Sequence, residues 1–328
     1  MSVLVTGSAG HLGEAVVRSL RTAGVEVAGL DAKPSPFTDV VGSIVDRARV
    51  SACLDGVDTV YHTATLHKPH VETHTKQDFV DTNISGTLAL LDAAVARGVA
   101  RLIFTSTTSV YGDAMRPPPG QPAVWVTEDT VPRPRNIYGV TKLAAEDLCR
   151  LFHRLHGLRC IILRTSRFFP EADDDRAQRA AFSDDNIKAN EFLHRRVDLE
   201  DVVSAHLLAA ERAETLGFGR YIVSATTPFV ADDVVELTRD APAVVRRRVP
   251  GAMESYRQLG WSMFGRINRV YVNRRARQDL GWQPRYDFAA VVARCLEGRP
   301  PLSDLSAAIG SKGYHDRVFD DGPYPVRE

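Results

Sequence analysis

A turn with three spaced glycines near the N-terminus constrains the fold of this chain more than any other feature. The turn reads Thr6-Gly7-Ser8-Ala9-Gly10-His11-Leu12-Gly13 and joins an apolar run at residues 2–6 to a helical apolar pattern at 11–22. Gly7 permits a tight turn, Gly10 lets backbone amides approach a pyrophosphate, and Gly13 lets the helix pack close to the strand. The pattern predicts a strand, turn and helix that bind a dinucleotide, with the anion at the helix N-terminus.

Alternating strands and helices follow this turn up to residue 165. We expect strands at residues 25–30, 58–62, 101–105 and 159–164, and helices at 81–97 and 138–156. This alternation predicts an α/β fold with a doubly wound parallel sheet of the Rossmann type. A helix at 201–212 and a short strand at 220–224 continue the pattern, and the remainder is interrupted by prolines.

These patterns predict two domains. Residues 1–165 with 197–225 form the dinucleotide-binding domain, and residues 166–196 with 226–328 form a smaller, mixed substrate-binding domain. The last stretch, 310–328, is rich in Gly, Asp, Pro and Tyr, so we expect it either to wrap the body or to be loose.

Asp31 ends the second predicted strand, 18 positions beyond Gly13. A carboxylate at this place accepts hydrogen bonds from the adenosine ribose hydroxyls and repels a 2′-phosphate, so it favours NAD over NADP. Lys33 lies two residues further on and would weaken that exclusion. The alternative is that Asp31 only caps a helix or turn.

Tyr138 and Lys142 lie four residues apart in a predicted helix, so they share one face. A tyrosine with a pKa of about 10 is a poor base at neutral pH. An adjacent ammonium and the positive ring of an oxidised nicotinamide favour the phenolate, which can remove the proton of a secondary alcohol while hydride leaves the carbon. The alternative is an exposed helical pair without a role in catalysis.

Charge and cysteine content exclude several other classes of protein. The 328 residues contain 41 basic and 41 acidic side chains, so no global field attracts nucleic acid or an anionic membrane. Cys53, Cys149, Cys160 and Cys295 form no C-x-x-C pair, which argues against zinc and against a disulfide framework. No apolar run approaches the roughly 20 residues of a membrane helix, and no signal peptide is evident. We expect a cytoplasmic protein.

Further motifs stand in a fixed order along the chain. They are Val60-Tyr61-His62-Thr63-Ala64, Asn83-Ile84-Ser85-Gly86-Thr87, Phe104-Thr105-Ser106-Thr107-Thr108-Ser109-Val110-Tyr111-Gly112 and Leu280-Gly281-Trp282-Gln283-Pro284. Together with the glycine turn and the Tyr138/Lys142 pair, they span residues 3–290. In this set the chain resembles the extended short-chain dehydrogenase/reductase family, specifically the NAD-dependent epimerase/dehydratase group.

The resemblance implies a role for each matching residue. Thr107 would be the catalytic hydroxyl that binds the reacting oxygen, Tyr138 the base, and Lys142 the residue that orients the nicotinamide ribose. Thr108 or Ser106 remains open as a substitute for Thr107. The residues expected to bind NAD are Gly7, Gly10, His11, Leu12, Gly13, Asp31, Ser43, Ile44, Ala64, Thr65, Asn83, Thr105, Tyr138 and Lys142. The family often has Asp where Ser43 stands. The resemblance also implies a homodimer that pairs the helices starting at residues 81 and 138.

The substrate region departs from the family pattern. Nucleotide-sugar enzymes of the family have a long segment after the strand that ends near Arg164, whereas here it is short. Arg167 stands in the usual Asn-Pro position, and His194-Arg195-Arg196 occupies the region of a diphosphate-binding arginine. These departures indicate a smaller substrate or a different clamp. Arg167, Arg195 and Arg196 can grip a carboxylate or phosphate, or form salt bridges with Glu171, Asp173, Asp174 or Asp198.

Histidines cluster at positions 62, 67, 70 and 74. Pro69 breaks the helical register between them and the expected chemistry needs no metal, so we predict no metal site. Instead, the loop is expected to lie over the nicotinamide. The residues expected to contact substrate are His67, Lys68, Thr107, Thr108, Arg167, His194 and Arg195.

The sequence thus predicts an enzyme that transfers hydride between NAD and a secondary alcohol of a small, sugar-like substrate. A sugar or nucleotide-sugar epimerase accounts best for the motifs. A net dehydrogenase or reductase of a small polyhydroxylated or acidic sugar uses the same residues and stays open. A module that only senses NAD is the third alternative.

Overall fold

The computed structural model describes residues 2–313 and 319. A seven-stranded, entirely parallel sheet has the order β3-β2-β1-β4-β5-β7-β8. Its strands are β1 (Ser2–Thr6), β2 (Val27–Asp31), β3 (Val40–Val41), β4 (Val57–His62), β5 (Arg101–Thr107), β7 (Arg159–Thr165) and β8 (Phe218–Val223). The strand order reverses between β1 and β4, which confirms the predicted doubly wound sheet.

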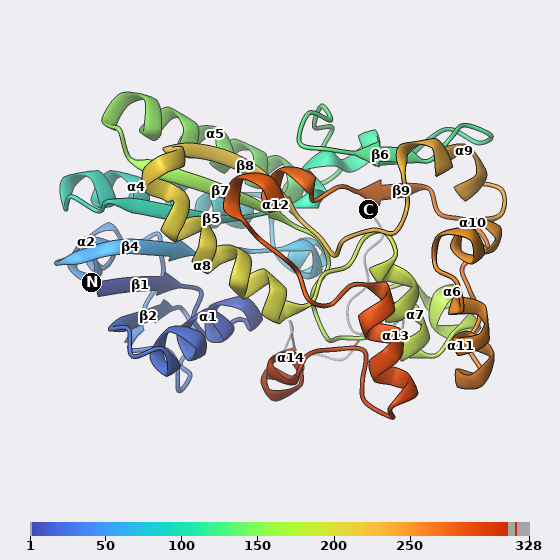
Figure 1. Cartoon of the computed structure of the whole chain (residues 1–328). Coiled ribbons are helices and arrows are strands. Elements are labelled where there is room, and N and C mark those ends of the chain that lie inside the picture. The colour runs from blue at the N-terminus through green and yellow to red at the C-terminus, as the bar shows by residue number, and fades with distance from the viewer. Residues whose placement is uncertain (1, 314–318, 320–328) are drawn as a thin grey trace.

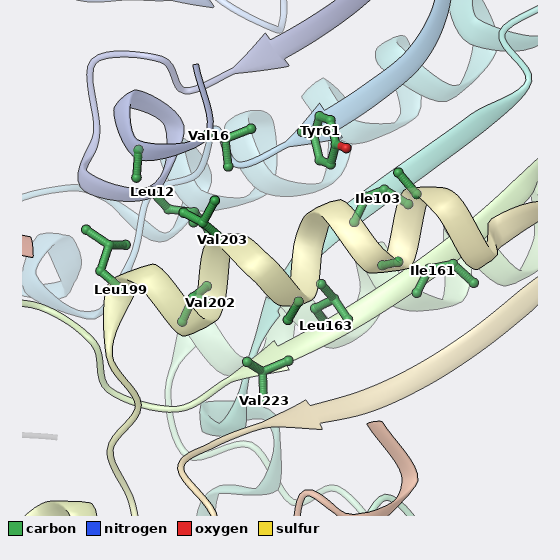
Figure 2. Packing of buried hydrophobic residues seen from close by; sticks show 14 of the residues in the cluster. Leu12, Val16, Tyr61, Ile103, Ile161, Leu163, Leu199, Val202, Val203 and Val223 are labelled. Carbon is green, nitrogen blue, oxygen red and sulfur yellow. The ribbon is translucent and has the colours of Figure 1, made fainter. Parts of the chain in front are cut away.

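Helices cover both faces of this sheet (Figure 1). One face packs against α1 (His11–Thr22) and α8 (Leu199–Leu216), and the other against α2 (Arg47–Cys53), α4 (Gly86–Ala96) and α5 (Ile137–His156). Val3 and Val5 of β1 belong to the first apolar cluster and Leu4 to the second, as the alternation of side chains along a strand requires. Figure 2 shows Leu12 of α1 beside Val203 of α8, with the strand residues Ile103 and Leu163 farther along the same helix.

A third apolar cluster lies beyond the sheet, built on α7 (Asp184–Phe192), α10 (Ala241–Arg248), α11 (Ala252–Leu259) and α13 (Phe288–Leu296). Beside it, β6 (Val124–Val126) and β9 (Arg269–Tyr271) form a two-stranded parallel sheet (Figure 1). The other elements are α3 (Lys76–Phe79), α6 (Arg176–Ala181), α9 (Val234–Leu237), α12 (Arg274–Leu280), α14 (Asp304–Ile309), η1 (Lys68–Glu72), η2 (Val80–Ser85), η3 (Thr108–Met115) and η4 (Ala231–Asp233).

Late segments of the chain also return to the main sheet. Leu280, Trp282 and Ile309 pack in the same cluster as α1 and α8. The indole Nε1 of Trp282 donates to the carbonyl of Asp201 over 3.1 Å. The assignment of 226–328 to a separate substrate domain therefore stays a proposal. No helix within the described part of the chain is long and apolar enough to span a bilayer.

The helix expected at 81–97 is interrupted. Residues Val80–Ser85 form a π-helical turn, and regular α-helix begins only at Gly86. This turn places Asn83, which is buried, between the loop after β4 and helix α5. Single π-helical turns are frequent at functional sites.

Candidate active site

A cavity of about 790 Å³ opens at the carboxyl ends of the strands. The glycine turn, the ends of β2, β4, β5 and β7, η3 and the start of α5 all line it. Ligands of doubly wound sheets bind at this edge, where the strand order reverses. The volume suits a dinucleotide with a small substrate.

Close packing explains two of the three glycines. Gly7 has a φ of +77°, and a Cβ there would lie 2.6 Å from the backbone nitrogen of Ala64. A Cβ on Gly13 would lie 1.9 Å from the carbonyl oxygen of Gly7, so the helix could not pack against the turn. Gly10 is the N-cap of α1 and supplies no side-chain cap. The first amides of α1 are therefore available to an anion, as a dinucleotide pyrophosphate requires.

Asp31 lies at the end of β2 and lines the cavity with Lys33, Ser43 and Ile44. Its carboxylate accepts hydrogen bonds from the backbone nitrogens of Ala9 at 3.0 Å and Lys33 at 2.8 Å. An ionised carboxylate has about four acceptor positions, so two remain for ribose hydroxyls. The arrangement fits NAD, and the amide bonds hold the carboxylate in place.

Thr107 and Tyr138 both line the cavity. Burial raises the pKa of Tyr138 to about 12, although the nearby Thr107 side chain acts in the opposite direction. Ser106 also belongs to the lining, but its hydroxyl donates to Glu146 over 2.5 Å. Thr108 lines the cavity as well. Among the three hydroxyl residues left open by the sequence, Thr107 is the one whose side chain acts on the Tyr138 phenol.

Lys142 is buried, and its Nζ lies 3.9 Å from the centroid of the Phe104 ring. Burial lowers its pKa to about 7. The residue is absent from the described cavity lining. Burial has the largest effect on the pKa of both Lys142 and Tyr138, and the expected effect of Lys142 on the phenol stays a prediction.

Asn83 holds the loop that follows β4. Its Oδ1 accepts from Thr65 Oγ1 and from the Leu66 backbone nitrogen, both at 2.9 Å. Its Nδ2 donates to Thr141 Oγ1 on α5 at 3.0 Å. Ala64 and Thr65 line the cavity, whereas Asn83 lies behind them and positions them. Thr105, also in the lining, is hydrogen-bonded to His206 at 2.9 Å.

A buried ion pair behind the hydroxyl pair was not found from the sequence. Nη2 of Arg164 lies 2.6 Å from Oε2 of Glu146, and both side chains are at most 1% exposed. Arg164 also donates to the Tyr111 hydroxyl at 3.0 Å. The sequence spacing could have indicated Glu146, because this residue follows Lys142 by four positions on the same face of α5.

A second missed cluster joins the glycine turn to the end of the described chain. Glu171 accepts hydrogen bonds from His11 Nε2 at 2.8 Å, Ser311 Oγ at 2.9 Å and the Lys312 backbone nitrogen at 3.1 Å. Burial alone would raise the pKa of Glu171, but the interactions with His11, the backbone and Ser311 together lower it to about 2. Lys312 also pairs with Glu14 on α1. Of the stretch 310–328, residues 314–318 and 320–328 lie outside the described part.

Most of the predicted substrate cations are engaged by carboxylates. Lys68 Nζ lies 2.7 Å from Asp174, and Arg167 lies 2.9 Å from Asp173. Arg195 and Arg196 both pair with Glu191, at 2.7 and 3.0 Å. These arginines therefore form salt bridges, which was the alternative that the sequence left open. Glu191 is a partner that the sequence analysis did not predict.

The two predicted histidines lie in different surroundings. His67 lines the cavity, stacks on Phe169 at 5.4 Å and faces Tyr138 edge-on at 6.5 Å. His194 is buried outside the described lining, where its Nδ1 donates to the carbonyl of Arg269 at 3.1 Å. The structure does not bring His194 to the cavity.

Comparisons with known proteins agree with this geometry. The model of the NAD dependent epimerase/dehydratase family matches residues 3–223. UDP-glucose 4-epimerase of Streptomyces lividans is 27% identical over 96% of this chain and 98% of its own length. The 3-beta-hydroxysteroid dehydrogenase of Mycolicibacterium neoaurum is 26% identical, with 94% of each chain covered. The uncharacterized protein y4nG of Sinorhizobium fredii is 33% identical to this chain over the matched region. That region covers 50% of this chain and 40% of the length of y4nG.

A solved structure extends the likeness to three dimensions. A short-chain dehydrogenase/reductase superfamily protein from Agrobacterium tumefaciens, solved with bound NAD, matches with a TM-score of 0.65 and 25% identity. The match covers 90% of this chain and 96% of that one.

Proposed function

Because this chain belongs to the NAD dependent epimerase/dehydratase family, we propose that it oxidises a secondary alcohol of a sugar-like substrate and returns the hydride, as a sugar or nucleotide-sugar epimerase. The observation that carries the proposal is that Thr107 and Tyr138 line one cavity with the glycine turn, with the Thr107 side chain acting on the Tyr138 phenol. NAD is the cofactor, and its nicotinamide accepts and releases hydride when bound.

The residues present fit that cofactor. Amides at the start of α1 would hold the pyrophosphate, and the two free acceptor positions of Asp31 would take the ribose hydroxyls. Asn83 fixes the loop carrying Ala64 and Thr65, which line the same cavity.

Proton transfer falls to the hydroxyl pair. With its pKa raised to about 12, Tyr138 is protonated at neutral pH and can donate a proton to a ketone oxygen. In the reverse direction Tyr138 must first be ionised, and its phenolate then accepts the proton of the alcohol. The positive charges of Lys142 and of a bound oxidised nicotinamide would favour the phenolate. Thr107 donates a hydrogen bond to the reacting oxygen.

A net dehydrogenase is the second candidate, because it needs the same residues. The relative named 3-beta-hydroxysteroid dehydrogenase is almost as similar to this chain as the relative named UDP-glucose 4-epimerase. A module that only senses NAD is disfavoured by the paired hydroxyls in the cavity.

The test is a panel of free, phosphorylated and nucleotide-linked sugars and uronic acids, each incubated with NAD. Product stereochemistry and NADH absorbance are followed together. Epimerisation gives a new stereoisomer without net NADH. NADH formed in proportion to substrate would replace the epimerase with the dehydrogenase, and neither change across the panel would contradict both.

We propose a homodimer as the assembly. Val140, Leu151 and Leu155 leave 48%, 37% and 61% of their surface exposed along α5. Large apolar side chains in a row on one helix face suit a helix-to-helix contact between two copies. Light scattering on the purified protein tests the mass.

We propose the cytoplasm as the compartment and the two-domain division given above as the organisation. The buried Cys149 and Cys160 thiols form no disulfide, as a reducing compartment favours.

A further inference from the structure

Three arginines from distant parts of the sequence line the Tyr138 side of the cavity. Arg116 follows η3, Arg135 lies three residues before Tyr138, and Arg269 is the first residue of β9. None of them was singled out by the sequence motifs.

Carboxylates neutralise this cluster only in part. Arg135 lies 2.9 Å from Asp113, but Arg116 and Arg269 take part in no ion pair within residues 2–313. The Nε of Arg269 is buried and has no hydrogen-bond partner among the described atoms. In contrast, Arg167 and Arg195 are held by Asp173 and Glu191. The cluster of Arg116, Arg135 and Arg269 therefore retains unused positive charge.

Electrostatics point the same way. Burial first, and then the charges of Arg135 and Arg269, lower the pKa of Arg116, whereas Asp113 acts in the opposite direction. Arg116 is therefore repelled by both of the other guanidinium groups. Among the described lining residues, eight are Lys or Arg and two are Asp. Five of the eight form ion pairs, and the described lining cations without one are Lys33, Arg116 and Arg269. A bound anion relieves the repulsion.

We propose that Arg116, Arg135 and Arg269 bind an anionic group of the substrate, a carboxylate or a phosphate carried by the sugar-like molecule that Tyr138 deprotonates. The proposal rests on the proposed function for the identity of the reacting alcohol. Guanidinium groups present paired donors that match the oxygens of either anion. Arg135 lies just before α5 and Tyr138 is the second residue of α5, so an anion on the cluster lies in the same cavity as the reacting hydroxyl.

The test measures binding without turnover. Tyr138→Phe protein saturated with NAD is titrated calorimetrically with glucuronate, galacturonate, glucose 1-phosphate, UDP-glucose and neutral methyl glucoside. We expect at least one anionic compound to bind at least tenfold more tightly than methyl glucoside. Glucuronate or galacturonate as the tightest ligand identifies a carboxylate, and glucose 1-phosphate or UDP-glucose identifies a phosphate.

Arginine variants then assign the preference to the cluster. Arg116→Gln combined with Arg269→Gln should reduce the preference for the anionic compound over methyl glucoside at least tenfold. NAD affinity and the thermal midpoint of unfolding should stay unchanged. Arg266→Gln, an exposed arginine three residues before Arg269 and outside the described lining, should leave the preference intact. Equal binding of neutral and anionic compounds, no binding of any of them, or a preference that survives the double variant would overturn the proposal. Failure of the wild-type protein to bind NAD would instead overturn the proposed function.

Discussion

Nε2 of His11 donates to Oε1 of Glu171 over 2.8 Å, across 160 positions of sequence. His11 belongs to the glycine turn, and Glu171 follows β7. The same carboxylate accepts from Ser311 and from the Lys312 backbone, so it ties the end of the described chain to the dinucleotide site. Lys312 and Gly313 line the cavity as a result.

We predict that Glu171→Ala weakens NAD binding by about tenfold, since hydrogen bonds to a charged group contribute about 1.5–3 kcal/mol and tenfold corresponds to about 1.4 kcal/mol. Calorimetric titration with NAD gives the affinity. Glu254→Ala removes an exposed carboxylate of α11 and serves as the control. Equal affinities for the two variants would show that Glu171 has no part in the site.

The Glu146–Arg164 pair should dominate local stability. Both side chains are buried, so Glu146→Gln leaves a guanidinium without its counter-charge and should lower the free energy of unfolding by about 3–5 kcal/mol. The exposed Glu254–Arg257 pair should contribute less than about 1 kcal/mol. Urea denaturation compares the variants, and a loss below about 1 kcal/mol for Glu146→Gln would be inconsistent with a buried ion pair.

Acid should destabilise the protein through buried neutral histidines. Burial lowers the pKa of His206 to about 4 and that of His62 to about 3. Between pH 4 and 6.5 the unfolded chain therefore binds more protons, and the free energy of unfolding rises with pH by up to about 1.4 kcal/mol per unit for each histidine. Burial raises the pKa of Asp201 to about 6, so between pH 3.8 and 6 the folded chain holds the extra proton at this residue. Asp201 therefore offsets the pH dependence that one histidine contributes in this range.

His206→Gln isolates the histidine contribution. The free energy of unfolding is measured for wild type and variant from pH 4 to 7, and the wild-type slope should be steeper by up to about 1.4 kcal/mol per unit. Identical slopes would mean that the pKa of His206 is the same in the folded and unfolded states.

Asp31→Ala should weaken NAD binding and relax the discrimination against NADP, because the variant loses both the ribose acceptors and the charge that repels a 2′-phosphate. Affinities for NAD and NADP are measured side by side. Lys33→Ala, which keeps the carboxylate, should retain the preference for NAD. Unchanged affinities for both cofactors in Asp31→Ala would refute the ribose role.

The sequence predicted the sheet because its strands and helices carry strong local patterns. β1 and α1 begin and end at the predicted residues, since an apolar run and a helical period meet at a turn of glycines. α2 was missed because Arg47–Cys53 is short and polar, and the pairing of β6 with β9 was missed because the two strands lie more than 140 positions apart. Local periodicity contains no information about such pairs.

The site divides in the same way. Glycine spacing and the Tyr138/Lys142 interval are local, so motifs can locate them. The environment of each group is not local: Lys142 packs on Phe104 from β5, and burial sets its pKa to about 7. The convergence of Arg116 and Arg269 likewise depends on folding, because their positions along the chain are unrelated.

Tyr138→Phe tests the central claim most directly. The substitution removes the hydroxyl on which the Thr107 side chain acts and leaves the glycine turn intact. With any substrate that the wild-type protein converts, hydride transfer followed by stopped-flow NADH absorbance should fall at least about a hundredfold while NAD affinity stays the same. Wild-type turnover in Tyr138→Phe would contradict the assignment of Tyr138 as the group that moves the proton.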